Sequence, residues 1–144
     1  MRYWDTSALV PLIFPEAESE RMKRLYAQEP EICTWVFTPV ELASALSRRR
    51  REGIPAGALL EARRLLLNLQ REWREIREIL AVREQAIRLL DAHPLRAADA
   101  LQLAAALAAA GDRPESVEFV TLDDRLAEAA RREGFKVKNL SAAR

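Results

Sequence analysis

Three acidic residues stand where a sheet of parallel strands would gather them at one edge. Asp5 ends a short apolar run, Glu41 follows a second run rich in β-formers, and Asp123 follows a third such run by two residues. Parallel strands share a carboxyl edge, and open α/β sheets bind their ligands there. Asp99 lies in an alanine-rich segment with no clear strand before it, so topology alone does not bring it to this group.

Carboxylates held together in this way repel one another. At about 4 Å each pair costs roughly 4 kcal/mol at an effective dielectric constant of about 20, whereas a whole fold is stable by only about 5–15 kcal/mol. A divalent cation relieves the repulsion, and oxygen ligands select Mg²⁺ or Mn²⁺. One Cys and one His argue against zinc. The pattern therefore indicates phosphodiester hydrolysis, in which the metal activates water and neutralises the leaving oxygen.

Each acid also has a structural explanation. Asp5 and Asp123 fit helix starts, where negative charge is stabilising, and Glu41 fits the far end of a capping box opened by Thr38. Asp99 resists such an explanation, because an acid on an Ala/Leu-rich helix face is expensive to bury without a partner. Arg96, three residues earlier, is a candidate surface partner.

The elements that must position these acids alternate along the chain. We expect a strand at 2–5 that turns into a helix capped by Thr6 or Ser7, which leaves the carboxylate of Asp5 for a ligand. Further strands are expected at 32–37, 117–121 and 135–140, and helices at 16–28, 38–52, 55–70, 80–92, 95–110 and 123–133. The segment 73–79 fits either a helix or an edge strand. The alternation predicts a single α/β domain over 1–144, with a parallel sheet covered on both faces.

Side-chain size and spacing refine this picture. The small residues of 95–110 let that helix lie close on the sheet, so we expect it to be central. In 80–92 the residues expected to point inward are Ala86, Ile87 and Leu90. The apolar stripe of 55–70 is wider than a core contact needs. It can therefore serve core packing, or form a groove for a dimer partner or a different protein partner. The stripe comprises Leu59, Leu60, Leu66, Leu67 and Leu69.

Composition suits one soluble globular domain, with 144 residues that are 49% hydrophobic and 31% charged. Cys33 is the single cysteine, so no internal disulfide forms and a reducing, cytoplasmic location is expected. We expect no signal peptide, and the most apolar stretch, 97–110, is too short to span a bilayer. Net charge is +1; with four of the 22 acids in one pocket, the 23 Lys and Arg outnumber the other acids by five.

Other chemistries find little support. The four glycines form neither a dinucleotide-binding motif nor a P-loop. A Ser-His-Asp triad would need His93, which precedes a proline and fits a helix end. A phosphatase with an aspartate nucleophile normally has a second Asp where this chain has Ser7.

Four motifs in this order resemble the PIN domain, in particular the VapC-type ribonuclease toxins of toxin–antitoxin pairs. They are DTSAL at 5–9, PVELASAL at 39–46, LRAADALQLA at 95–104 and VTLDDRL at 120–126. The resemblance implies a five-stranded parallel sheet with the first strand central. It also implies a Mg²⁺- (or Mn²⁺-) dependent endoribonuclease that acts on RNA, commonly as a homodimer, with a cognate antitoxin protein and no membrane association.

The resemblance assigns roles to particular residues. It carries the catalytic, metal-binding acids onto Asp5, Glu41, Asp99 and Asp123. Of these, we expect Asp5 and Asp99 to be the main metal ligands, and Glu41 and Asp123 to complete the site or orient water. Thr6, Ser7 and Thr121 support them. One position departs from the family pattern, and at another the pattern fits either of two neighbouring residues. Gln102 stands where many relatives have His, with little expected loss. Asp124 directly follows Asp123, and the spacing from Thr121 favours Asp123.

The strongest basic run, residues 48–51, has two explanations. It could contact an RNA backbone, and because consecutive helical residues diverge, Arg48 and Arg51 are the candidates. Alternatively, it is a solvated helix end whose cations suit the helix dipole. Two rival functions also remain open: a non-catalytic α/β module that binds a partner's Arg in the acidic pocket, and a phosphatase of small molecules.

Overall fold

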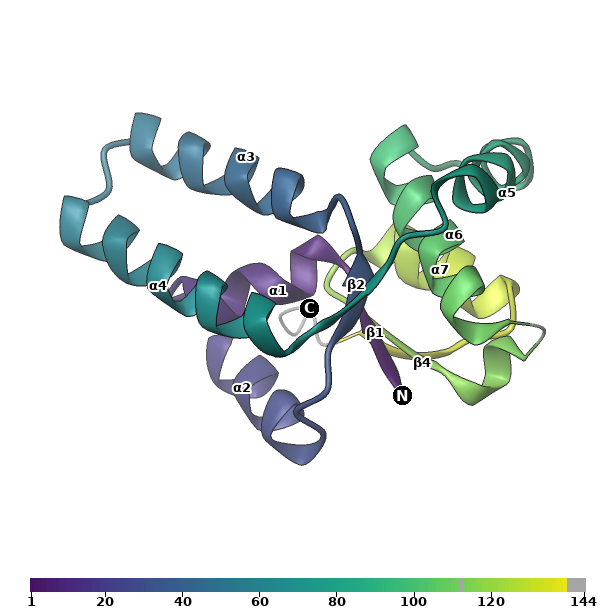
Figure 1. The fold of residues 1–144 in the computed structure, drawn as a ribbon, viewed down its shortest axis with the longest axis horizontal. Helices are drawn as coiled ribbons and strands as arrows, with labels where there is room; N and C mark the ends of the chain where they lie inside the picture. Colours follow the sequence, from purple (N-terminus) through teal and green to yellow (C-terminus); the bar gives the residue numbers. More distant parts are fainter. Residues whose placement is uncertain (112, 140–144) are drawn as a thin grey trace.

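The fold is built on one wholly parallel sheet, seen in a computed structural model that describes residues 1–111 and 113–139. Its five strands run in the order β3-β2-β1-β4-β5, and Figure 1 shows β1 between β2 and β4. They are β1 Arg2–Trp4, β2 Cys33–Trp35, β3 Arg74–Ile76, β4 Glu118–Thr121 and β5 Lys136–Asn139. The predicted α/β class and the central place of the first strand are confirmed. The expected strand end at Leu140 lies outside the described residues.

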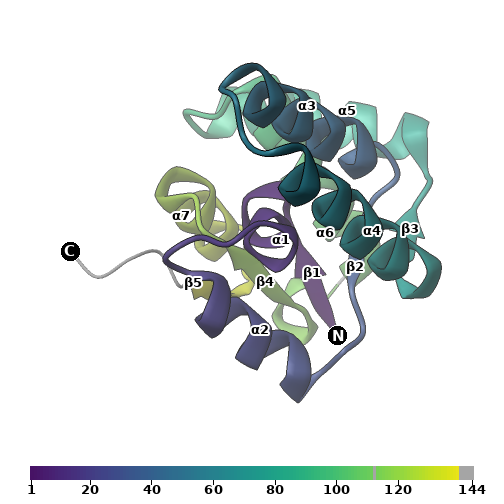
Figure 2. The ribbon, with the colours of Figure 1, turned by 90° about the vertical axis from the view of Figure 1, so that its left-hand side faces the viewer.

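Helices cover both faces of the sheet and enclose two separate cores (Figure 2). They are α1 Thr6–Ile13, α2 Ser19–Gln28, α3 Thr38–Arg51, α4 Ala56–Glu72, α5 Ile79–Ala92, α6 Ala97–Ala110 and α7 Asp124–Arg132, with a 3₁₀ turn η1 at Pro114–Ser116. One core is built by α1 to α4 and the other by α5 to α7. Among the described residues, none of these helices combines the length and apolar character that a membrane crossing would need.

Successive side chains of β1 point to opposite faces of the sheet, so neighbouring residues of the strand enter different cores. Tyr3 faces the core of α5 to α7 and stacks on Phe119 of β4, with ring centroids 5.5 Å apart. Trp4 faces the opposite core, as does its cross-strand partner Val120. This register places the end of β1 level with the end of β4, and the backbone N–H of Asp5 donates to the carbonyl of Val120 at 3.1 Å.

The alanine-rich α6 lies close on the sheet, as expected. It contacts β2 and β3 and packs against α5. Its buried face is largely methyl groups, which is why the helix can approach so closely: Ala100, Ala104, Ala105 and Ala106. The helix therefore begins at the carboxyl edge of the sheet although no strand directly precedes it.

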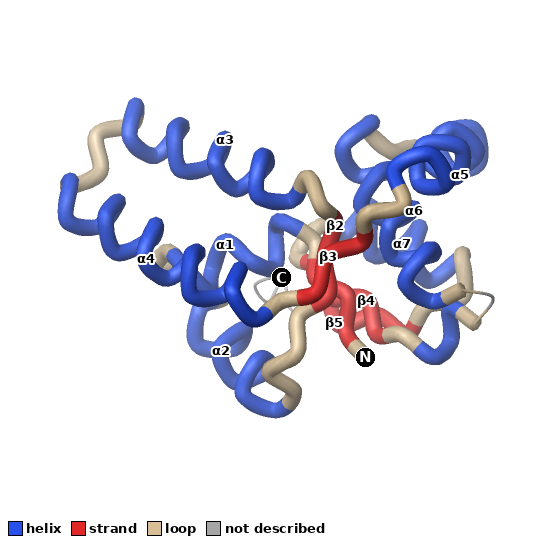
Figure 3. The backbone as a smooth tube through the Cα atoms, viewed as in Figure 1, coloured by secondary structure: helices blue, strands red, loops and turns tan. Residues whose placement is uncertain are grey.

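The structure resolves one alternative that the sequence left open and changes two expectations. The segment 73–79 contains the edge strand β3 (Figure 3), and α2 begins only at Ser19. The prediction that Ile87 and Leu90 of α5 point inward was wrong, because these side chains are 59% and 42% exposed. The buried stripe has the spacing i, i+4, i+7 instead and comprises Val82, Ala86 and Leu89.

Candidate active site

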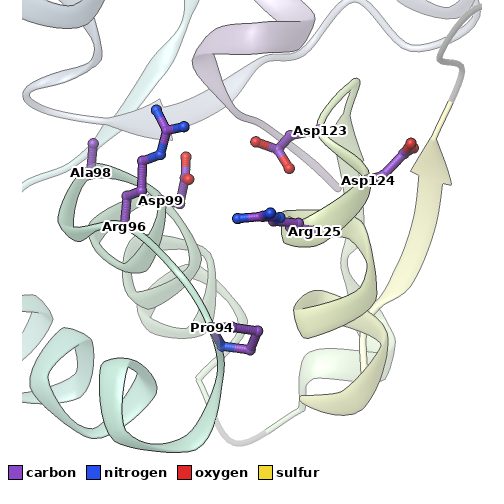
Figure 4. A pocket seen from close by; sticks show the side chains of 7 residues that line it. All are labelled: Pro94, Arg96, Ala98, Asp99, Asp123, Asp124 and Arg125. Atoms are coloured by element: carbon purple, nitrogen blue, oxygen red, sulfur yellow. The ribbon is translucent and has the colours of Figure 1, made fainter.

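Four acids from four elements line a single pocket of about 510 Å³ at the carboxyl edge of the sheet. Asp5 follows β1, Glu41 lies in the first turn of α3, Asp99 in the first turn of α6, and Asp123 directly before α7. A second pocket of about 460 Å³ adjoins it and shares Asp99 and Asp123 (Figure 4). Asp99 reaches the group because α6 starts at this edge.

Asp5 itself caps α1, so the expectation of a cap at Thr6 or Ser7 was wrong. Its carboxylate accepts the backbone N–H of Ala8 at 3.1 Å. Asp5 has extended backbone angles, φ −81° and ψ 171°, which are those of an N-cap residue. The first residue after β1 is therefore already the cap of α1. The side chain is only 3% exposed, and capping does not turn it away from the pocket.

Two hydroxyls connect Asp5 to the loop that carries Asp123. Ser7 Oγ donates to Asp5 at 2.8 Å and accepts the backbone N–H of Leu122 at 2.9 Å. Thr121 Oγ1 donates to Asp5 at 3.0 Å and accepts the backbone N–H of Asp123 at 3.0 Å. The two ends of β1 and β4 are thereby held together at the pocket.

Burial raises the pKa of Asp5 from 3.8 to about 7. Hydrogen bonds from Ser7, Thr121 and Ala8 oppose this increase, and the negative charge of Asp123 adds to it. Near neutral pH the carboxyl group is therefore divided between its two protonation states. A bound cation would favour the carboxylate.

Glu41 is held by side chains rather than by its own helix end, so the predicted capping box was wrong. The helix α3 has no side-chain cap. Thr6 Oγ1 donates to Glu41 Oε2 at 3.0 Å, and Gln102 Nε2 donates to Oε1 at 2.8 Å. The Thr38 hydroxyl instead lies within hydrogen-bond distance of Thr34, 2.8 Å away, in the buried interior.

Gln102 is the residue that the sequence reasoning undervalued. It is 1% exposed, and its Oε1 accepts the hydroxyl of Tyr3 at 2.6 Å. This bond turns the amide nitrogen toward Glu41 and toward Thr38 Oγ1, 3.0 Å away. The available signal was a polar residue three positions after Asp99 in an otherwise apolar helix, since such residues share a helix face.

The variant Gln102→Leu is expected to lower Mn²⁺ affinity or activity by about 10- to 100-fold, the usual effect of removing a group that orients a ligand. It also removes the Gln102 acceptor of the buried Tyr3 hydroxyl, and losing such a hydrogen bond costs about 1–3 kcal/mol of unfolding free energy. Calorimetric Mn²⁺ titration and urea unfolding measure the two effects. Gln102→His keeps a ring N–H and should retain more affinity, whereas equal losses in both variants would contradict an orienting role. Gln70→Leu is the control.

Asp99 is half-buried and surrounded by negative charge. Its pKa is raised by burial and by the charges of Asp123 and Glu41, while Arg96 lowers it. Within the described chain, Asp99 accepts no hydrogen bond and forms no ion pair, so the surface pair with Arg96 that the sequence left open is not formed. The Asp99 carboxylate is therefore available to a ligand of the pocket.

Asp123 and Asp124 face different surroundings. Asp123 caps α7 by accepting the N–H of Leu126 at 3.0 Å and lines both pockets. Asp124 points away from Asp99 (Figure 4), and its carboxylate accepts the amide of Asn139 at 2.8 Å. This geometry favours Asp123 as the ligand.

Asp123→Asn is therefore expected to reduce the Mn²⁺-induced rise in melting temperature, and Asp124→Asn is expected to leave it nearly unchanged. Asn caps helices about as well as Asp, so the metal-free stability of Asp123→Asn should change by less than about 1 kcal/mol. Differential scanning fluorimetry with and without Mn²⁺ makes the comparison. A larger loss in Asp124→Asn would assign the metal to the other carboxylate.

The donor set fits a hard divalent cation. Among the described residues, no three acidic, His or Cys side chains already form a closed set of metal ligands. The acids surround an open pocket instead. Mg²⁺ keeps several waters and takes only one or two carboxylates, so an open site lined by oxygen donors suits it.

A comparison with protein-family models agrees with this geometry. The model described as the PIN domain matches residues 2–132. The chain belongs to the PIN domain family. PIN domains are generally metal-dependent nucleases. A search of curated proteins found no match.

The basic run of this PIN domain divides in the structure. Arg48 lines the larger pocket, whereas Arg51 is exposed and lines neither pocket of the site. Arg49 pairs with Glu16 and lies over the ring of Phe14, 4.8 Å from its centroid. Of the two predicted RNA contacts, Arg48 is thus the one placed beside the acids.

Proposed function

We propose that this PIN domain is a Mg²⁺- or Mn²⁺-dependent endoribonuclease and the toxin of a toxin–antitoxin pair. The observation that carries the nuclease chemistry is the pocket in which Asp5, Glu41, Asp99 and Asp123 meet without a soft ligand beside them. Asp5 and Asp99 would hold the metal, with Glu41 and Asp123 completing the site. The metal would supply water activation and neutralise charge on the leaving oxygen.

The residues of the chain fix the geometry that this reaction needs. Ser7 and Thr121 hold the carboxylate of Asp5, and Thr6 and Gln102 hold that of Glu41. Because these two hydrogen bonds fix its position, the Glu41 carboxylate stays in the pocket, where it can orient water and accept a proton. Arg48 would contact a phosphate of the substrate.

The proposed partners rest on the likeness to VapC-type toxins and on the surface of α4. Leu60 and Leu67 are exposed on that helix, while Leu59 and Leu66 are buried. The exposed pair suits a second copy of the chain or an apolar helix of a cognate antitoxin. A basic side chain of the antitoxin would fit the acidic pocket.

The test is cleavage of single-stranded RNA with Mg²⁺ or Mn²⁺, repeated with EDTA and with small phosphate monoesters as substrates. We expect internal RNA cleavage that EDTA abolishes, and no turnover of the monoesters. Cleavage that ignores EDTA would refute the metal mechanism. Turnover of monoesters with RNA intact would instead indicate a phosphatase, and Mn²⁺ binding without any turnover would indicate a binding module.

A further inference from the structure

The smaller pocket of the site contains two arginines that the chemistry above does not use. Arg96 lies directly before α6, and Arg125 lies in the first turn of α7. Figure 4 shows Arg96 with Asp99 on one side of the pocket and Arg125 with Asp123 on the other. Both arginines are exposed, and within the described residues neither guanidinium group has a hydrogen bond or an ion pair.

We infer that Arg96 and Arg125 form a subsite for a backbone phosphate of single-stranded RNA in the smaller pocket, which Arg48 does not line. This inference rests on the proposed function and extends it from the scissile phosphate to a neighbouring one. The guanidinium fork matches phosphate oxygens. Two such forks, one directly before α6 and one in the first turn of α7, can hold one phosphodiester between them.

The charge balance of the pocket favours an incoming anion. The acids that line this pocket with the two arginines are Asp99, Asp123 and Asp124, and the carboxylate of Asp124 accepts the amide of Asn139. Asp99 and Asp123 are also proposed metal ligands, so a bound cation would take up their charge and leave two guanidinium groups beside the single carboxylate of Asp124. The arginines would then be left with an excess of positive charge next to the reaction site, which a phosphate neutralises.

The shape of the site favours an extended chain over a single small anion. The two pockets share Arg96, Ala98, Asp99 and Asp123, so they form one continuous groove. Arg48 lines only the larger part and Arg125 only the smaller part, and Asp99 and Asp123 line both. A strand that is held at phosphates in both parts of the groove is cut internally, which agrees with an endonuclease.

The test measures binding without cleavage. A labelled single-stranded RNA analogue with a non-cleavable backbone is titrated with the full chain in Mn²⁺, between about 50 and 200 mM salt, by fluorescence anisotropy. Arg96→Gln and Arg125→Gln are each expected to weaken binding roughly 3- to 10-fold and to reduce the slope of log affinity against log salt by about 0.7. The matched controls are Arg63→Gln and Arg71→Gln, exposed arginines of α4 that line neither pocket.

A kinetic measurement in Mn²⁺ separates this inference from the proposed function. The two variants should raise KM with little change in kcat, because they remove binding that is equal in the ground state and the transition state. The subsite alone would be overturned if the chain cleaves RNA but neither substitution changes its RNA affinity, or if the control substitutions lower that affinity equally. The absence of RNA binding by the unsubstituted chain would overturn it too. Affinity that depends on both arginines without any cleavage would keep the subsite and refute the nuclease.

Discussion

Asp5→Asn is expected to lower metal-dependent RNA cleavage on the order of 10³-fold, because a catalytic metal contributes several kcal/mol and each 1.36 kcal/mol is about tenfold in rate. The substitution removes the charge that a cation needs. It keeps an oxygen that accepts the N–H of Ala8, so α1 retains its cap. The loss should therefore appear in activity and not in folding.

Thermal shift with Mn²⁺ makes this result specific. The unsubstituted chain should melt at a higher temperature in Mn²⁺ than in EDTA, since a ligand that binds only the folded state stabilises it. Asp5→Asn should lose most of that difference. Asp91→Asn, which changes an exposed acid on α5, is the control. Full cleavage by Asp5→Asn would remove Asp5 from the metal site.

The metal-free protein is expected to lose stability as pH rises from about 4 to about 7, with Asp5 as the main cause. Its pKa is 3.8 in the reference state and about 7 in the fold, so between these values the folded state binds more protons than the unfolded state. Stability falls with pH under that condition. The full shift corresponds to at most about 4 kcal/mol.

Urea unfolding in EDTA at pH 5 and at pH 8 measures the effect. Asp5→Asn has no titrating group at this position, so its stability should vary less over the same range and exceed that of the unsubstituted chain at pH 8. Mn²⁺ should restore stability at pH 8 only when Asp5 is present. Identical pH profiles for the two proteins would show that burial of the Asp5 carboxylate carries no such penalty.

The sequence predicted the parts of the site that follow from parallel strands. Asp5, Glu41 and Asp123 were expected at one edge because each follows a strand. Asp99 follows the helix α5, so its place depended on how closely α6 packs on the sheet, and only the resemblance supplied it. The cap of α1 was missed because Asp, Ser and Thr all cap well, and the choice depends on where the strand ends.

Gln102 shows why some site residues escape sequence reasoning. Its role depends on Tyr3 of β1 lying beneath α6, and the two residues are 99 positions apart in the chain. Ile87 and Leu90 show a different failure, since a helix with apolar residues on two faces does not reveal which one meets the core. Both questions are answered by packing, which a single sequence does not display.

The two cores on opposite faces of the sheet have a consequence for the motions of the protein. Glu41 belongs to α3, which packs in one core, while Asp99 and Asp123 belong to α6 and the start of α7, which pack in the other. Asp5 directly follows β1, the strand between them. A cation held by these acids would fasten the two halves to each other, so amide hydrogen exchange should slow together in α3 and α6 when metal binds.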